Sequence, residues 1–187
     1  MSENKIFTWK IGGQAGQGQQ SAGLIFAKAC IRGGYHTFDY SEYPSLIRGG
    51  HVSFAVSVAD RPISAIYESV NLLIALNKET IQKHAKYLSK DGVILYDGDV
   101  IKKEELGVIK NVLFSLPMET LAKANNLPAL ASNIIAVGAS CGLVQFDQTI
   151  LHDAISHIFE RKGQGVVDMN IKAAKIGYEY TQKNFHP

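Results

Sequence analysis

Apolar residues along the chain fall into short runs and helical stripes that alternate with one another. Short or strictly alternating apolar runs predict strands, and apolar positions three and four residues apart predict helices. Strands are expected at residues 6–11, 35–40, 51–58, 71–76, 93–96 and 111–116, with a turn at Asp91 and Gly92. Helices are expected at residues 19–32, 78–89, 117–125, 130–143, 148–160 and 166–183. The regular alternation at 51–58 predicts a strand buried on one face only.

The order of these elements predicts the fold class. Residues 6–40 have the length and pattern of a βαβ unit, which indicates a parallel sheet. Alternating strands and helices followed by a helical end predict an α/β fold: a three-layer Rossmann-like domain with a mostly parallel central sheet and a helical C-terminal part. The 187 residues are 46% hydrophobic and contain no repeat or linker, so we expect a single domain over residues 1–187.

Composition argues against several classes of function. The net charge is +2 and no long run of like charges occurs, so neither nucleic acid nor an anionic membrane surface is an expected partner. No 18-residue apolar stretch and no signal peptide is visible, and a cytoplasmic location is expected. Cys30 and Cys141 both lie in apolar helix patterns and are too few for an iron–sulfur cluster or a structural zinc site. Any redox centre is therefore expected on a partner.

The segment from Gly12 to Gly18 carries four glycines between a strand and a helix. Glycine is costly in regular structure, so the cluster indicates positive φ angles or a close approach to a phosphate-bearing ligand. A P-loop is excluded because Gln19 and Gln20 follow where Lys and Ser or Thr are needed. Two alternatives remain. The glycines could belong to a dinucleotide fingerprint in which Asp39 binds the ribose, or they could form a tight turn that binds no ligand. The candidate cofactor-binding residues here are Gly13, Gln14, Ala15, Gly16, Gln17 and Gly18.

A second candidate is the loop from Ser41 to Gly50. Loops that follow parallel strands gather at one edge of the sheet, so this loop is expected beside the glycine-rich turn. A guanidinium there can hold a phosphate or carboxylate, although it can also fasten its own loop or a subunit contact. The candidate cofactor-binding residues in this loop are Ser45, Arg48, Gly49 and Gly50.

The sequence contains no recognisable catalytic set. The six histidines lack metal-site spacing, and neither a Ser-His-Asp set nor a G-x-S-x-G elbow occurs, so no metal site and no catalytic residue is expected. Asn133 and Asn170 lie in otherwise apolar helices, where each amide needs a backbone partner or a ligand. The helix over 133–142 is rich in small residues, which allow close approach of another helix or subunit. The sequence therefore predicts a protein that binds a ligand or partner and is not a catalyst on its own.

Taken together, the segments Ile11 to Gly18, Glu42 to His51 and Ser132 to Gly138, with Asn170, resemble the gamma subunit or gamma domain of the 2-oxoacid:ferredoxin oxidoreductases. The resemblance runs over essentially the whole chain. The Tyr-Pro-Ser-Leu-Ile-Arg-Gly-Gly form of residues 43–50 is most similar to the domain at the amino end of fused alpha subunits in 2-oxoglutarate and related enzymes. A separate subunit and the front of a fused chain both fit.

This resemblance implies a complex that converts a 2-oxoacid, such as pyruvate or 2-oxoglutarate, and coenzyme A into an acyl-CoA, CO2 and reduced ferredoxin. It implies thiamine diphosphate, magnesium and iron–sulfur clusters on partner subunits or domains. The implied partners are alpha and beta subunits, with a delta subunit and a homodimer within the complex left open, and ferredoxin indirectly. The chain itself is expected to position coenzyme A and to support assembly.

Two other functions remain open at this point. The chain could be a free-standing dinucleotide-binding protein that uses Gly16, Gly18 and Asp39. It could also be a purely structural module in which both loops serve subunit interfaces.

Overall fold

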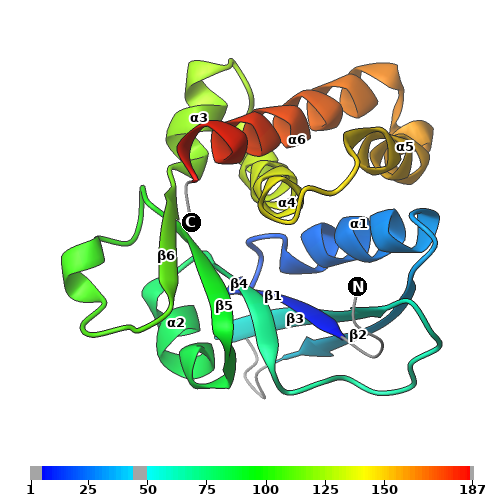
Figure 1. Cartoon of the computed structure of the whole chain (residues 1–187). Helices are drawn as coiled ribbons and strands as arrows, with labels where there is room; N and C mark the ends of the chain where they lie inside the picture. The colour runs from blue at the N-terminus through cyan, green and yellow to red at the C-terminus, as the bar shows by residue number, and fades with distance from the viewer. Residues whose placement is uncertain (1–5, 44–49, 186–187) are drawn as a thin grey trace.

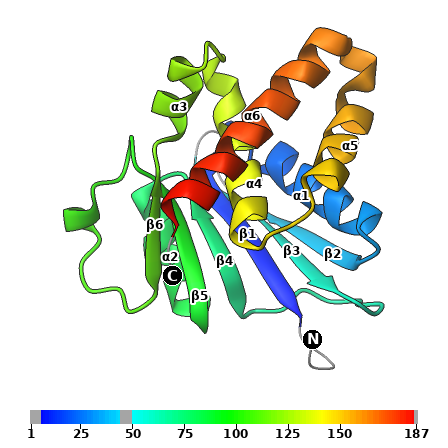
Figure 2. The same cartoon turned by 45° about the horizontal axis from the view of Figure 1, so that its top comes forward.

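A six-stranded sheet forms the centre of the protein, whose computed structural model describes residues 6–43 and 50–185 (Figures 1 and 2). The strands lie in the order β2-β3-β1-β4-β5-β6. They are β1 (Phe7–Gln14), β2 (His36–Glu42), β3 (His51–Ala59), β4 (Val70–Ala75), β5 (Leu88–Asp97) and β6 (Val112–Leu116). β1, β4, β5 and β6 pair in parallel, whereas β3 is antiparallel to both of its neighbours. The predicted α/β class with a mostly parallel sheet is confirmed.

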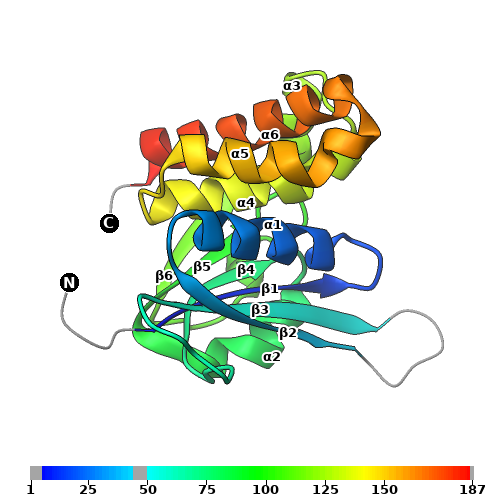
Figure 3. The same cartoon turned by 90° about the vertical axis from the view of Figure 1, so that its right-hand side faces the viewer.

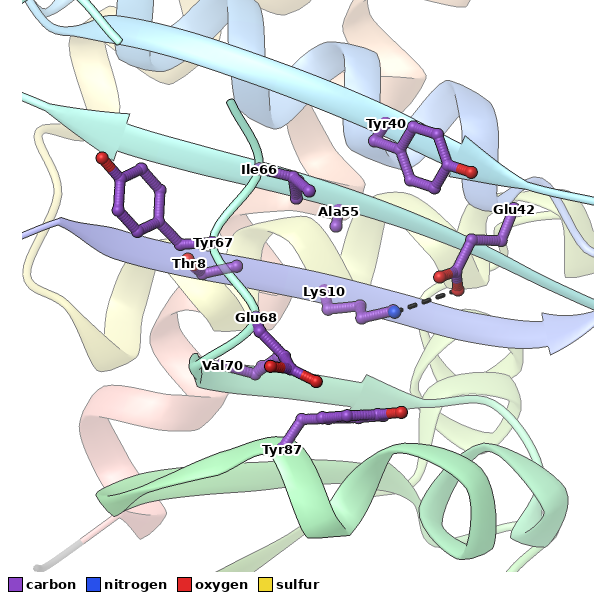
Figure 4. A pocket seen from close by; sticks show the side chains of 10 residues that line it. All are labelled: Thr8, Lys10, Tyr40, Glu42, Ala55, Ile66, Tyr67, Glu68, Val70 and Tyr87. Atoms are coloured by element: carbon purple, nitrogen blue, oxygen red, sulfur yellow. Dashed lines mark hydrogen bonds and ion pairs between the residues drawn. The ribbon is translucent and has the colours of Figure 1, made fainter. Parts of the chain in front are cut away.

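Strand β3 separates the two strands of the predicted βαβ unit. Helix α1 (Gln19–Arg32) returns the chain so that β2 runs in the same direction as β1, but β3 lies between them and pairs with both. The prediction of a strand buried on one face is wrong, because every residue of β3 is buried. One face packs against α1, and the chain segment through Ile66 and Tyr67 crosses the other face (Figure 4).

Helices cover the two faces of the sheet unequally. Helices α1, α4 (Ser132–Leu143), α5 (Gln148–Phe159) and α6 (Gln164–Asn184) lie on one face, whereas the short α2 (Lys78–His84) lies on the other (Figures 1 and 3). The remaining helix, α3 (Met118–Ala124), follows β6. The helical C-terminal part is therefore present as predicted. No helix in the described part of the chain is long and apolar enough to cross a bilayer.

The region between α2 and β5 differs from the sequence prediction. The helix expected over 78–89 is shorter, because a turn of 3-10 helix follows at Ala85–Tyr87 and β5 begins at Leu88. Asp91 and Gly92 lie within β5 rather than in a turn, at an irregularity in the pairing with β4. The side-chain amide of Asn111 donates hydrogen bonds to the carbonyls of Ser89 and Gly92, which satisfies backbone groups that the ladder leaves open.

Two apolar clusters hold the sheet to its helices. The larger lies beneath α1, α4, α5 and α6 and contains Trp9, whose ring stacks on Phe26 with 4.8 Å between centroids. The smaller lies between β4, β5 and α2 and includes Leu73, Ile81 and Ile94. The larger cluster contains residues of both the sheet and the helical C-terminal part, so the two share one apolar core.

Helices α4 and α6 approach each other through glycines. A Cβ atom added at Gly138 would lie 1.9 Å from the carbonyl oxygen of Ala174, and one added at Gly177 would lie 1.9 Å from the carbonyl oxygen of Ile135. Such distances leave no room for a side chain, so the two backbones are in direct contact. The small-residue pattern of residues 133–142 thus serves close helix packing, one of the two roles that the sequence allowed.

The variant Gly138→Ala is expected to lower the free energy of unfolding by about 2–3 kcal/mol, because the added methyl group meets backbone that cannot move aside. Urea unfolding followed by the fluorescence of Trp9, the single tryptophan, measures the change. Gly165→Ala is the matched control, since its Cβ meets nothing within 4 Å, and we expect it to be neutral or stabilising by about 0.5–1 kcal/mol. Equal stabilities for Gly138→Ala and the parent would contradict the contact.

Candidate functional site

The glycine-rich turn joins the carboxyl end of β1 to the start of α1. Gly16 and Gly18 have φ angles of +93° and +82°, which side-chain-bearing residues rarely adopt. The backbone N–H of Gln14 donates to Oε1 of Gln17 at 2.6 Å, and Nε2 of Gln19 donates to the Gln14 carbonyl at 2.9 Å. The turn is therefore held by its own side chains, and the predicted need for positive φ is confirmed.

Helix α4 packs directly against this turn. A Cβ atom at Gly18 would lie 2.0 Å from Nδ2 of Asn133, in the first turn of α4. The amide of Asn133 thus lies against the start of α1. Asn170, in α6, is buried and donates through Nδ2 to the Val166 carbonyl at 2.7 Å.

The second candidate loop is described only at its two ends, residues 41–43 and Gly50. Ser45, Arg48 and Gly49 lie outside the described residues. The carbonyl of Gly50 accepts a hydrogen bond of 3.0 Å from the N–H of Ala15, so this end of the loop adjoins the glycine-rich turn as predicted. As expected, the loop follows a strand that runs in the same direction as β1, although β2 and β1 are not neighbours and the loop leads into the antiparallel strand β3.

A cleft of about 540 Å³ opens beside the turn, and its volume is typical of small-molecule sites. It lies where β1 and β4 end and the chain leaves in opposite directions, the usual ligand position in open α/β sheets. Of the predicted residues, Gly16, Gln17 and Gly18 line it. Gly13, Gln14, Ala15 and Gly50 do not line it, although they support or adjoin the turn.

Three helices begin at this cleft without a side-chain cap. Neither α1, α4 nor α6 has a capping side chain or an acidic residue in its first turn. By contrast, Asn77 caps α2, Asp147 caps α5, and Asp99 accepts a hydrogen bond from the N–H of Thr120 in α3. Figure 3 shows the starts of α1, α4 and α6 at the same end of the molecule. Because the N–H groups at an uncapped helix start and the helix dipole favour negative charge, this edge of the sheet favours an anion.

Charged side chains in the cleft lie on different walls. Asp97 at the end of β5 and Glu119 in α3 are acidic, whereas Lys162 precedes α6. Burial raises the pKa of the Asp97 carboxyl to about 6, although the N–H of Asp99 donates to it at 3.1 Å. Asp97 was not predicted from the sequence, and its position at the carboxyl end of a parallel strand is the signal that would have indicated it.

Asp39 does not reach the glycine-rich turn. It lies in the edge strand β2 opposite Val56, which pairs in turn with Trp9, the third residue of β1. The inserted strand β3 thus separates Asp39 from the cleft, and a ribose contact from this residue is ruled out. The dinucleotide-binding alternative therefore lacks the carboxylate that was expected to bind the ribose.

A polar cluster lies beneath the turn on the other face of the sheet. Nε2 of His51 and Nε2 of His84 lie 2.8 Å apart, and burial lowers the pKa of both imidazoles, that of His84 to about 4. Lys10 and Glu42 form an ion pair of 3.0 Å at the edge of a hollow of about 230 Å³ (Figure 4), and Ser53 donates to the same carboxylate. These contacts join α2 and β2 to the strands that carry both loops.

The raised pKa of Asp97 predicts a pH-dependent effect of Asp97→Asn on stability. Between pH 3.8 and about 6 the native state binds more protons than the unfolded state, so this carboxyl lowers stability as the pH rises. We expect the variant to be more stable than the parent by about 1–2 kcal/mol at pH 8 and equal to it near pH 4.

Urea unfolding at the two pH values measures this difference. Asp91→Asn, at an exposed position of the same strand, is the matched control. The same stabilisation at pH 4 and pH 8 would show that ionisation of Asp97 is not its cause.

The family described as pyruvate ferredoxin/flavodoxin oxidoreductase matches residues 8–180. The chain belongs to this family. The matched region runs from β1 into α6 and includes the glycine-rich turn and the cleft, so the family resemblance extends to the whole of the candidate site.

A family relative of known role is the ketoisovalerate oxidoreductase subunit VorA of Methanothermobacter marburgensis, which is 31% identical over 180 residues. The alignment covers 94% of this chain and 36% of that protein, so the chain spans about a third of the relatives that it matches first. The 2-oxoglutarate synthase subunit KorC of Methanocaldococcus jannaschii is 22% identical, and 93% of each chain is covered. Family members thus include both long and short chains.

Solved structures of the family share this fold. The gamma subunit of a keto/oxoacid ferredoxin oxidoreductase from Geobacter sulfurreducens has a TM-score of 0.83 and 26% identity, covering 96% of this chain and 98% of its own. The 2-oxoglutarate:ferredoxin oxidoreductase of Magnetococcus marinus, solved with 2-oxoglutarate, coenzyme A and succinyl-CoA bound, has a TM-score of 0.86 and 23% identity. It covers 98% of this chain and 32% of its own. The fold of this chain therefore matches that of the Geobacter sulfurreducens gamma subunit over nearly its whole length.

Proposed function

We propose that this chain is the gamma subunit or gamma domain of a 2-oxoacid:ferredoxin oxidoreductase complex, which converts a 2-oxoacid and coenzyme A into an acyl-CoA, CO2 and reduced ferredoxin. Its own part is to position coenzyme A and to hold neighbouring subunits together. The observation that carries the proposal is the convergence of the glycine-rich turn and three uncapped helix starts on one cleft, in a chain of this family. The coenzyme A bound in the Magnetococcus marinus enzyme supports the choice of ligand.

The phosphates of coenzyme A match the chemistry of this edge. Backbone N–H groups at helix starts bind phosphate through hydrogen bonds and through the helix dipole. The turn that carries Gly16 and Gly18 is held rigid, so little ordering is needed when an anion binds. The loop of Ser45, Arg48, Gly49 and Gly50 would add a guanidinium from the neighbouring side, where Gly50 adjoins Ala15.

Thiamine diphosphate, magnesium and the iron–sulfur clusters belong, in this proposal, to the alpha and beta subunits and, where present, a delta subunit. Iron–sulfur clusters are ligated by thiolates. Burial raises the pKa of Cys30 to about 12 and raises that of Cys141 as well, so both remain neutral thiols inside the apolar core. Among residues 6–43 and 50–185, no group of histidine, cysteine and carboxylate side chains could hold a metal ion.

This division of labour has a physical advantage. The reacting thiol of coenzyme A lies at the far end of the molecule from its nucleotide. Binding energy from such a remote part can orient the thiol towards an intermediate held on a partner subunit. The gamma chain would thereby contribute to the rate without a catalytic residue.

The experiment is steady-state kinetics of the reconstituted complex with Arg48→Ala in this chain. Loss of a charge-assisted phosphate contact should raise KM for coenzyme A about tenfold and leave kcat nearly unchanged. Arg32→Ala, at an exposed position at the opposite end of α1 from the turn, is the matched control and should leave both constants unchanged.

The kinetics also separate the alternatives. An unchanged KM for coenzyme A would exclude a direct phosphate role for Arg48. If the chain is required for the complex to assemble, but variants in the turn and in the loop all leave KM unchanged, the chain is a structural module only. A complex that assembles and turns over normally without this chain would overturn the proposed function.

A further inference from the structure

Two buried histidines join the end of the second candidate loop to helix α2. His51 is the first residue of β3 and His84 is the last residue of α2, and only 9% and 6% of their surfaces are exposed. Their Nε2 atoms lie 2.8 Å apart. The ring of His51 lies over Gly12 of β1, where an added Cβ would be 3.0 Å from its Cε1 atom. The His51 ring is therefore held between β1 and α2.

This histidine pair adjoins the point where the hairpin meets the glycine-rich turn. His51 lies opposite Gln14 in the ladder between β1 and β3. The residue before it, Gly50, accepts the hydrogen bond of 3.0 Å from the N–H of Ala15. Because Gly50 and His51 share a peptide bond, displacement of His51 also displaces the carbonyl that Ala15 contacts.

The contact between the two rings accommodates only the neutral pair. A hydrogen bond between two Nε2 atoms needs one N–H and one bare nitrogen, so one ring carries its proton on Nε2 and the other on Nδ1. A further proton on the bare Nε2 would meet the N–H opposite. A further proton on the bare Nδ1 would lack an acceptor, since both Nδ1 atoms are buried and have no hydrogen-bond partner within the described part of the chain.

The surroundings of the pair also oppose a further charge. The groups that face it are Lys10 in β1, Glu42 in β2, Glu79 and Lys83 in α2, and Tyr87, whose ring centroid lies 6.4 Å from that of His84. Burial is the main cause that lowers the pKa of both histidines, and the two lysines lower it further. The two carboxylates offset this effect only in part.

The neighbouring carboxylates keep their charge in mild acid. Burial raises the pKa of Glu42, but hydrogen bonds from Ser53 and Lys10 lower it by more. A hydrogen bond from Lys83 lowers the pKa of Glu79. Between pH 7 and pH 5, acid therefore acts on this contact through the two imidazoles themselves.

We propose that the histidine pair is an acid-sensitive contact, which holds the end of the loop at the glycine-rich turn while both rings are neutral and opens when the pair takes up one proton. In the open state the charged ring reaches water, and Gly50 separates from Ala15. The opening follows from the geometry of the pair alone. Its consequence for ligand binding rests on the proposed function, which assigns the turn and this loop to coenzyme A.

The direction of the pH dependence follows from the two states. In the open state a histidine has its usual pKa of 6.5, whereas in the closed state the pKa of His84 is lowered to about 4, so the open state binds the proton more tightly. Opening is independent of pH well above 6.5. It becomes up to about tenfold more favourable for each pH unit between 6.5 and about 4.

Nuclear magnetic resonance on the full chain tests the contact without any variant. At neutral pH, long-range proton–nitrogen spectra should show one of the two rings protonated on Nε2 and the other on Nδ1. The protection of the Ala15 amide against hydrogen exchange, corrected for the intrinsic rate, should fall about tenfold between pH 7 and pH 5.

The variant His84→Gln should remove the response to acid. A glutamine amide both donates and accepts hydrogen bonds, so it can pair with the ring of His51 whether or not that ring is charged. We expect the protection of Ala15 to change by less than about twofold over the same pH range. His157→Gln, the same substitution at an exposed position of α5, is the matched control and should keep the tenfold loss. Circular dichroism confirms that each variant is folded.

Three results would overturn the inference. The first is a charged ring in the pair at neutral pH. The second is titration of either ring near its usual pKa while the protection of Ala15 stays constant. The third is an equal loss of protection in acid for the parent and for folded His84→Gln, which would assign the effect to another group.

Kinetics of the reconstituted complex separate this inference from the proposed function. If both hold, KM for coenzyme A should rise more between pH 7 and pH 5 with the parent chain than with His84→Gln. If the contact opens as measured by hydrogen exchange and the two KM profiles are the same, the acid-sensitive contact stands and the coenzyme A role of this edge loses support.

Discussion

Close approach of helix α4 to its neighbours is the constraint on which the rest of the structure depends. The backbones meet at Gly138 and Gly177, and the side chain of Asn133 fills the space that a Cβ at Gly18 would occupy. Because all three contacts involve the same helix, α4 couples the glycine-rich turn to α6. The width of the cleft between them is therefore set by packing in the core rather than by mobile surface loops.

The cleft carries features that lower the stability of the fold and favour the binding of a ligand. Three helices that begin at the cleft, α1, α4 and α6, have no capping side chain, whereas Asn77 caps α2 and Asp147 caps α5. The missing cap costs roughly a few tenths of a kcal/mol where the cap residue is glycine, as at Gly18 and Gly163, and about 1 kcal/mol where it is Ala131. Burial of Asp97, which raises its pKa, is a further cost at the same place. Locally unfavourable features gathered at one cleft in an otherwise consistent structure are typical of functional sites.

Sequence patterns predicted the types of most elements, the strand-to-helix position of the glycine-rich turn and its positive φ angles, because these depend on local periodicity and backbone sterics. They did not predict that β3 is inserted between β1 and β2, since strand pairing is decided by contacts between distant segments. For that reason Asp39 was placed near the turn at a spacing that holds only for adjacent strands. Asp97 was overlooked separately, although it ends the parallel strand β5. The buried amides of Asn133 and Asn170 were noticed because apolar helices rarely contain them, but only the folded structure brings both to the cleft.

The antiparallel position of β3 also affects how freely the loop between β2 and β3 can vary in length. A crossover loop between parallel strands has to span the sheet, so its length is constrained by the layers that it connects. Here the loop closes a hairpin whose two strands are paired in register from His36 opposite Ala59 to Glu42 opposite Ser53. Residues can be added to or removed from the tip while the sheet, the turn and the cleft keep their positions. Family members can therefore diversify the chemistry beside a shared site by exchanging one hairpin tip.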